Sequence, residues 1–265
     1  MIARGPSPAV PRLLVVLALV GAAFVLLPFL ALVWRTPWDQ AWSEITTPEV
    51  AAALRLSLAC SLAATVLSVV LGLPLAWVQA RLEFPGRALL RGLTTLPVIL
   101  PPVVGGVALL LAFGRRGVLG QWLDATTGVR LPFTGLGVVV AETFVAMPFF
   151  VLTLESALRS VDTRLEDAAR SLGASPWTVL RRVTLPLVRP ALLAGAVLAW
   201  ARALGEFGAT ITFAGNVPGK TQTLPLAVYL ALETRPEGAM VLSVLMVAVS
   251  LAVLIGLRRQ WVRAL

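Results

Sequence analysis

Long uncharged apolar stretches constrain this chain more than any other feature of its sequence. Several windows of about 20 residues carry almost no charge, and each is long enough to cross a hydrocarbon core about 30 Å thick as a helix. An unpaired backbone amide in lipid costs several kcal/mol, and a helix avoids this cost because it pairs its own backbone groups. Hydrophobic residues make up 58% of the chain and charged residues 13%. These features predict an all-α integral membrane protein.

The apolar blocks predict about six transmembrane helices. The run that begins at Leu13 is too long for the hydrophobic part of a signal peptide and lacks a following A-x-A site, so we expect it to remain as the first span. The predicted spans lie at about residues 12–34, 51–78, 89–113, 136–157, 191–213 and 238–257.

The basic residues lie between the apolar blocks, so the net charge of +9 indicates membrane topology rather than nucleic-acid binding. With a cytoplasmic N-terminus, most arginines fall on the inner side, and the positive-inside rule then places both termini in the cytoplasm. The inner set is Arg4, Arg12, Arg81, Arg87, Arg91, Arg159, Arg164, Arg170, Arg181, Arg182, Arg189, Arg258, Arg259 and Arg263. The outer set is Arg35, Arg115, Arg116, Arg130, Lys220 and Arg235.

Side chains for catalysis or metal binding are scarce. The chain has one cysteine, Cys60, and no histidine, so a disulfide framework, a zinc site and a Ser-His-Asp triad are not expected. We expect no catalytic residue, metal site or cofactor in this chain.

The stretch "AGNVPGKT" at 214–221 has the spacing of a nucleotide-binding P-loop, with Ala214 in place of the first glycine. A membrane-anchored P-loop protein would need a strand before this loop and a helix that continues from it. An apolar span precedes the loop instead, and Pro225 follows it. We therefore interpret the loop as an outer turn, in which Asn216 helps re-aim the chain and Lys220 attracts an anion or an acidic protein rim.

The one long cytoplasmic connection, about 158–190, is organised as two short helices. The first is expected to stop at Gly173, and the second to start with Ser175 as N-cap and Pro176 in its first turn.

Pro186 and Pro190 are expected to end the second helix before the fifth span begins. Two amphipathic helices in this position need a surface on which to dock. One interpretation is that they lie on lipid, held by Arg181 and Arg182, and the other is a protein partner.

The stretch "DAARSLGASPWTVLRRVTLP" resembles the EAA loop of importer-type ABC permease subunits. The matching positions are Asp167, Ala168, Ala169, Gly173, Val183, Leu185 and Pro186. Asp167 stands where the family usually has Glu, which keeps the negative charge.

This resemblance implies that the segment is a coupling helix inserted into a separate cytoplasmic ATPase, where ATP and Mg would be bound. Small Ala168 and Ala169 would allow close approach, and Glu166, Asp167 and Arg170 would orient the contact at its rim. The turn through Gly173, Ala174, Ser175 and Pro176 completes the implied coupling segment. A passive channel would need no such docking helix.

The resemblance extends over about 50–235. "LPVILPPVVGGVALLLAFGRRGVLG", "FVAMPFFV" and "ARALGEFGATITFAGNVPGKTQTLPLAVY" are similar to molybdate permease subunits. Sulfate or thiosulfate permeases share "ALGEFGA" and an AGN- or SGN-like turn, but differ over the stretch that is "VPGKTQTLPLAVY" here. Tungstate is not separated from molybdate by sequence. The resemblance implies a type I importer fold in one permease domain over 1–265, a homodimer, two ATPase subunits, an extracytoplasmic oxyanion-binding protein and a place in the inner membrane.

Hydroxyls and a broken helix are candidates for the anion pathway. Ser57 and Ser61 lie on one face of the second span, although helix packing explains such a face equally well. In the third span, Thr94 and Thr95 precede a Pro- and Gly-rich break that includes Pro101 and Gly105. Broken backbone at membrane depth is tolerated inside protein or beside a water-filled cavity.

Arg202 and Glu206 are charged residues inside the fifth span, beside Gly205. Buried charges are costly in a membrane, and the i,i+4 spacing makes the two residues natural partners. We expect a brace or gate; the alternative is that Arg202 touches the passing anion while Glu206 limits how tightly it binds.

Overall fold

The computed structural model describes residues 11–261, and all regular structure in that range is helical. The long elements are α1 (Arg12–Arg35), α3 (Pro48–Arg81), α7 (Gly135–Ser160), α10 (Leu185–Leu204) and α13 (Pro236–Trp261). The shorter ones are α2 (Trp38–Ile45), α4 (Arg87–Ile99), α5 (Pro102–Phe113), α6 (Gly120–Thr127), α8 (Thr163–Ser171), α9 (Pro176–Val179), the π-helical η1 (Leu180–Thr184), α11 (Gly208–Phe213) and α12 (Leu224–Thr234).

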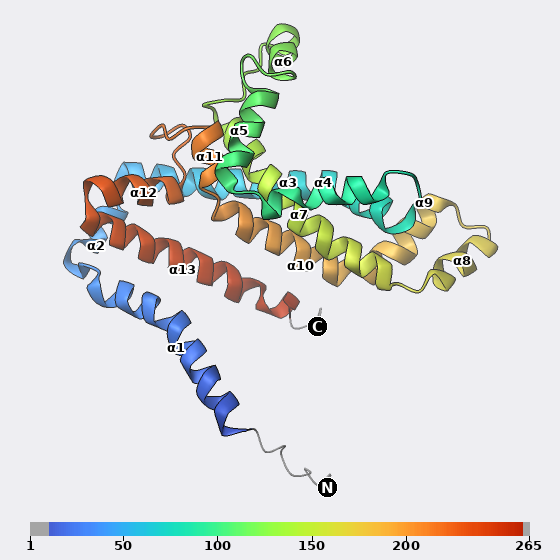
Figure 1. Ribbon diagram of the computed structural model, residues 1–265, viewed down its shortest axis with the longest axis horizontal. Helices are drawn as coiled ribbons and strands as arrows, with labels where there is room; N and C mark the ends of the chain where they lie inside the picture. The colour runs from blue at the N-terminus through green and yellow to red at the C-terminus, as the bar shows by residue number, and fades with distance from the viewer. Residues whose placement is uncertain (1–10, 262–265) are drawn as a thin grey trace.

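Helix α7 forms the centre of the bundle and packs against α3 and α10 (Figure 1). Small residues fill this contact: Ala64, Ala146, Ala199 and Ala203 are all fully buried. Small side chains let membrane helices approach closely, so van der Waals packing holds the bundle together. At one end of the long helices lie α8 and α9, and at the opposite end lie α2 and α12.

The structure confirms a membrane-spanning architecture. Within the described residues, five helices are long and apolar enough to cross a membrane, and α5 and α12 are shorter apolar helices. The predicted third span is divided, as its prolines suggested: α4 ends at Ile99, Leu100 is extended, and α5 starts after Pro101. Arg4 and Arg263, used in the charge count, lie outside the described residues.

The fifth span begins much earlier than predicted. The expectation that Pro186 and Pro190 end the preceding helix was wrong, because α9, η1 and α10 run on as one helical stretch, Pro176–Leu204. Pro186 falls in the first turn after η1, a position that proline tolerates, and Pro190 lies inside α10 without ending it.

Helix α1 diverges from the bundle and contacts α13. It has no buried residue in the protomer, so its apolar surface is available to lipid or to another chain. Helices α5 and α6 also project from the side of the bundle (Figure 1).

Candidate functional site

The connection after α7 folds into two helices that start where predicted, the short α8 and a second helix that runs on from α9 into α10. Asp162 caps α8, with its Oδ1 accepting a hydrogen bond from the Arg164 N–H at 3.0 Å. The helix ends in a Schellman-type turn, in which the Ala174 N–H donates to the Ala169 carbonyl at 3.1 Å. Gly173 has φ +85°, which side chains rarely tolerate, so the sequence needs glycine there.

The second helix starts as predicted. Ser175 Oγ accepts a hydrogen bond from the Thr178 N–H at 3.2 Å, and Pro176 occupies the first turn of α9. Together, α8, the Gly173 turn and α9 form a compact unit at one end of the bundle (Figure 1).

The charged residues of α8 do not all face outward. Asp167 and Arg170 are exposed and pair at 2.8 Å, and Ala168 is exposed beside them. Glu166 is only 2% exposed and points into the protein, so its predicted place at the rim of an ATPase contact was wrong. A buried carboxylate cannot reach a separate subunit.

Three large apolar side chains on this segment were missed by the sequence reasoning. Leu165 on α8, Leu172 at its end and Trp177 on α9 are exposed, Leu172 at 89%. Large apolar side chains left exposed are typical of docking surfaces, and we call these three residues the apolar coupling face. Their signal in the sequence was large apolar residues at positions where a solvated loop would be polar.

The break between α10 and α11 carries the predicted ion pair. Arg202 Nη2 lies 2.6 Å from Glu206 Oε2, with side chains 27% and 1% exposed. Glu206 also ties the next helix to the pair, because its Oε1 accepts the Ala209 N–H at 2.8 Å. Gly205, between the two charges, is exposed. We call this unit the charged hinge.

The candidate pathway hydroxyls make contacts within the protomer. Ser57 Oγ accepts the Leu224 N–H at 2.7 Å, and Ser61 Oγ accepts the Trp200 Nε1–H at 3.0 Å. Both serines are buried, and these bonds join α3 to α12 and α10. The packing interpretation therefore accounts for their positions, and their role in a pathway stays a prediction.

The hydroxyls near the break in the third span also make hydrogen bonds within the protomer. Thr94 Oγ1 accepts a hydrogen bond from the buried Gln79 amide at 2.7 Å, and Thr95 Oγ1 donates to the Arg91 carbonyl at 3.0 Å. Gly105 is packed so closely that a Cβ there would lie 3.0 Å from Phe144, whereas Pro101 is exposed.

The P-loop-like segment cannot cradle a phosphate in this conformation. The N–H groups of Lys220, Thr221 and Gln222 all donate to the Val217 carbonyl, so they are turned inward. Helix α11 precedes the loop where a nucleotide-binding fold has a strand. Asn216 is half-buried and Lys220 is exposed, and the place of this turn on the outer side stays a prediction.

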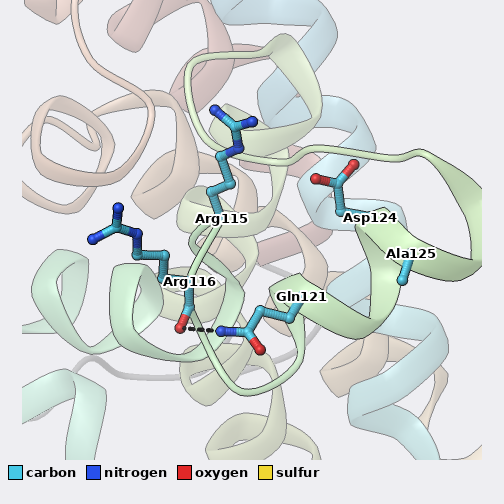
Figure 2. A pocket seen from close by; sticks show the side chains of 5 residues that line it. All are labelled: Arg115, Arg116, Gln121, Asp124 and Ala125. Atoms are coloured by element: carbon cyan, nitrogen blue, oxygen red, sulfur yellow. Dashed lines mark hydrogen bonds between the residues drawn. The ribbon is translucent and has the colours of Figure 1, made fainter.

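A polar depression of about 670 Å³ lies beside the turn between α5 and α6, lined by Arg115, Arg116, Gln121, Asp124 and Ala125 (Figure 2). Gln121 Nε2 donates to the Arg116 carbonyl at 3.1 Å and holds the turn. Asp124 pairs with Arg130 at 3.0 Å. Within residues 11–261, neither Arg115 nor Arg116 has an ion-pair partner.

A multi-pass helical bundle with an exposed two-helix connection and a charged hinge is an architecture typical of a membrane permease subunit. The chain matches the family of binding-protein-dependent transport system inner membrane components over residues 68–265, and it belongs to that family.

Relatives whose transported substrate is known narrow the comparison. The chain is 48% identical to the molybdenum transport system permease protein ModB of Mycobacterium tuberculosis (strain ATCC 25618 / H37Rv), over 95% of both chains. It is 43% identical to ModB of Escherichia coli (strain K12), over 72% of this chain and 83% of that one. The sulfate transport system permease protein CysT of the same strain is 39% identical, over 84% and 82%.

Solved structures confirm the fold. A bacterial ABC transporter that imports the acidic polysaccharide alginate contains a chain that superposes with a TM-score of 0.73. The two chains are 18% identical, and the match covers 95% of each. The type I importer architecture is therefore shared despite low sequence identity.

Proposed function

We propose that this chain is the permease subunit of an ATP-driven importer that moves molybdate across the cytoplasmic membrane by alternating access. The observation that carries the proposal is 48% identity to a molybdenum permease over 95% of both chains. The sulfate permease relative is less similar, at 39%, so sulfate or thiosulfate is the second candidate. Tungstate is a tetrahedral oxyanion of nearly the same size and is expected to share the pathway.

The energy for transport comes from a separate ATPase that binds ATP and Mg. The coupling segment supports this proposal, because its apolar coupling face is exposed on a short, rigid helical unit. Two permease copies would each receive one ATPase. Liposomes that contain permease and ATPase should accumulate radioactive molybdate only when ATP and the oxyanion-binding delivery protein are also present. Entry of molybdate without ATP and without the ATPase would indicate a passive channel.

The transport pathway forms between two copies of the chain. This proposal is supported by the position of α7, which fills the centre of the protomer and packs on α3, α4, α5, α10 and α11. Because a helix fills the centre of the protomer, the transport pathway would run along the protomer's surface, where a second copy can enclose it. The exposed α1 and Pro101 lie on surfaces that such a pairing or lipid would cover.

An extracytoplasmic oxyanion-binding protein delivers the anion to the outer face. The solved alginate transporter was also crystallised in complex with its alginate-bound periplasmic protein. In this chain, Arg115 and Arg116 extend from the α5–α6 turn (Figure 2), and Lys220 is exposed on the loop before α12. These cations fit an acidic rim on the delivery protein, which would both steer and orient it.

Cysteine labelling tests this orientation and docking together. A membrane-impermeant thiol reagent should label Lys220→Cys and Arg116→Cys from outside intact cells, and bound delivery protein should protect both sites. Wild-type protein is the control, since its Cys60 is buried. Labelling only after the cytoplasmic side is opened would overturn the topology, and labelling without protection would overturn the docking site.

A further inference from the structure

The Glu166 carboxylate is the point where three helical elements meet. Its Oε1 accepts hydrogen bonds from Arg81 Nη2 at 2.7 Å and from Thr184 Oγ1 at 2.9 Å. Arg81 is the last residue of α3, and Thr184 is the last residue of η1, directly before α10. One oxygen atom therefore joins α8 to two long helices. We call Glu166, Arg81 and Thr184 the carboxylate clamp.

This clamp is the main attachment of α8 to the bundle. Glu166 is the one buried residue of this helix, and the large apolar side chain next to it, Leu165, faces outward. Since no buried apolar residue anchors α8, its position depends on the ionic and hydrogen-bonded contacts of Glu166. Arg170 pairs with Asp167 at 2.8 Å and lies 3.7 Å from the second Glu166 oxygen, but all three residues belong to α8, so these contacts do not attach the helix to the bundle.

A continuous helix connects the clamp to the charged hinge. From Thr184, α10 runs to Arg202, a rise of about 27 Å at 1.5 Å per residue. The segment on the clamp side, η1, is π-helical, a form found at functional sites in helices. At the far end, Glu206 holds both Arg202 and the first turn of α11. A shift of Thr184 along the helix axis would thus reach the hinge.

We propose that Glu166 is a positioning residue that transmits the displacement of the coupling segment to α3 and α10, and through α10 to the charged hinge. The proposal rests on the proposed function, because it requires an ATPase that moves α8. It assigns Glu166 a mechanical role within the permease, in place of the contact with the ATPase that the sequence suggested. Without the clamp, α8 moves with the ATPase while the long helices stay behind.

The test compares Glu166→Gln with Glu83→Gln in the complete complex of permease, ATPase and delivery protein in liposomes. Glu83 is the matched control, because it is an exposed glutamate on the loop that follows α3 and receives the same substitution. ATP hydrolysis and molybdate uptake are measured on the same samples, together with the stimulation of hydrolysis by loaded delivery protein. If Glu166 were needed only for folding, its substitution would lower the amount of assembled complex without changing the molybdate uptake per ATP hydrolysed.

For Glu166→Gln, we expect basal hydrolysis to persist while uptake per ATP falls about tenfold and the stimulation by delivery protein is lost. Glu83→Gln should match the wild type. If Glu166→Gln does not assemble, Thr184→Val removes only one bond of the clamp and should lower uptake per ATP about threefold. Unchanged uptake per ATP and unchanged stimulation in the assembled variant would overturn the proposal. Failure of the proposed function would show instead as absent uptake by the wild type.

Discussion

Leu172→Glu is expected to abolish uptake by preventing the ATPase from binding to the permease. Leu172 is 89% exposed at the end of α8, so the substitution should leave the fold intact. In the proposed complex this side chain is buried against the ATPase, where a carboxylate without a partner would be costly. Loss of a central apolar contact costs about 2 kcal/mol or more, roughly thirtyfold in affinity. Co-purification of the ATPase with tagged permease measures the effect.

Leu172→Met is the matched control, because it keeps an apolar side chain of similar volume and should bind the ATPase as the wild type does. Gly173→Val gives a second route to the same loss, since a β-branched residue resists φ +85°. If the ATPase co-purifies with the Leu172→Glu variant as it does with the wild type, the apolar coupling face is not part of the ATPase interface.

Arg202→Ala is expected to destabilise the permease by about 3–5 kcal/mol, because it leaves the Glu206 carboxylate buried without its cation. Thermal unfolding in detergent, followed by the loss of monodisperse protein, measures the change. Arg55→Ala is the control: Arg55 lies in α3, is exposed, and donates only to the Ala51 carbonyl of its own helix. Equal stability of Arg202→Ala and the wild type would contradict the brace.

The double variant Arg202→Met/Glu206→Met separates the two roles considered for this pair. If the pair is a brace, the neutral and apolar replacement recovers most of the stability and also recovers uptake. If Arg202 touches the anion, stability recovers while uptake stays low. We expect recovery of both, because Arg202 pairs with Glu206 and the other Glu206 oxygen accepts the Ala209 N–H, so the groups of the hinge are partnered within the protomer.

Several features of the site followed from local sequence rules. The turn at Gly173 needed a residue that tolerates positive φ, and Ser175 followed by Pro176 is a helix start whatever surrounds it. The Arg202–Glu206 pair followed from i,i+4 spacing in an apolar stretch. Each of these features is set by residues that are close in sequence, so it could be predicted from the sequence alone.

Other features depended on contacts between distant residues. The burial of Glu166 is decided by Arg81, which lies 85 positions away, and nothing within α8 shows which side of the helix meets the bundle. Helix α12 was missed because its 11 residues are too few for a span, and it is held by Ser57 from α3. Pro190 did not end α10, since packing in the bundle outweighs the missing hydrogen bond.

Anion competition in reconstituted transport tests most directly whether this permease carries molybdate. Liposomes holding permease and ATPase are given delivery protein and radioactive molybdate, and unlabelled molybdate, tungstate or sulfate is added in excess. We expect molybdate and tungstate to suppress labelled uptake and sulfate to leave it unchanged. Suppression by sulfate as strong as that by molybdate, with ATP-dependent sulfate uptake, would show instead that the permease carries sulfate.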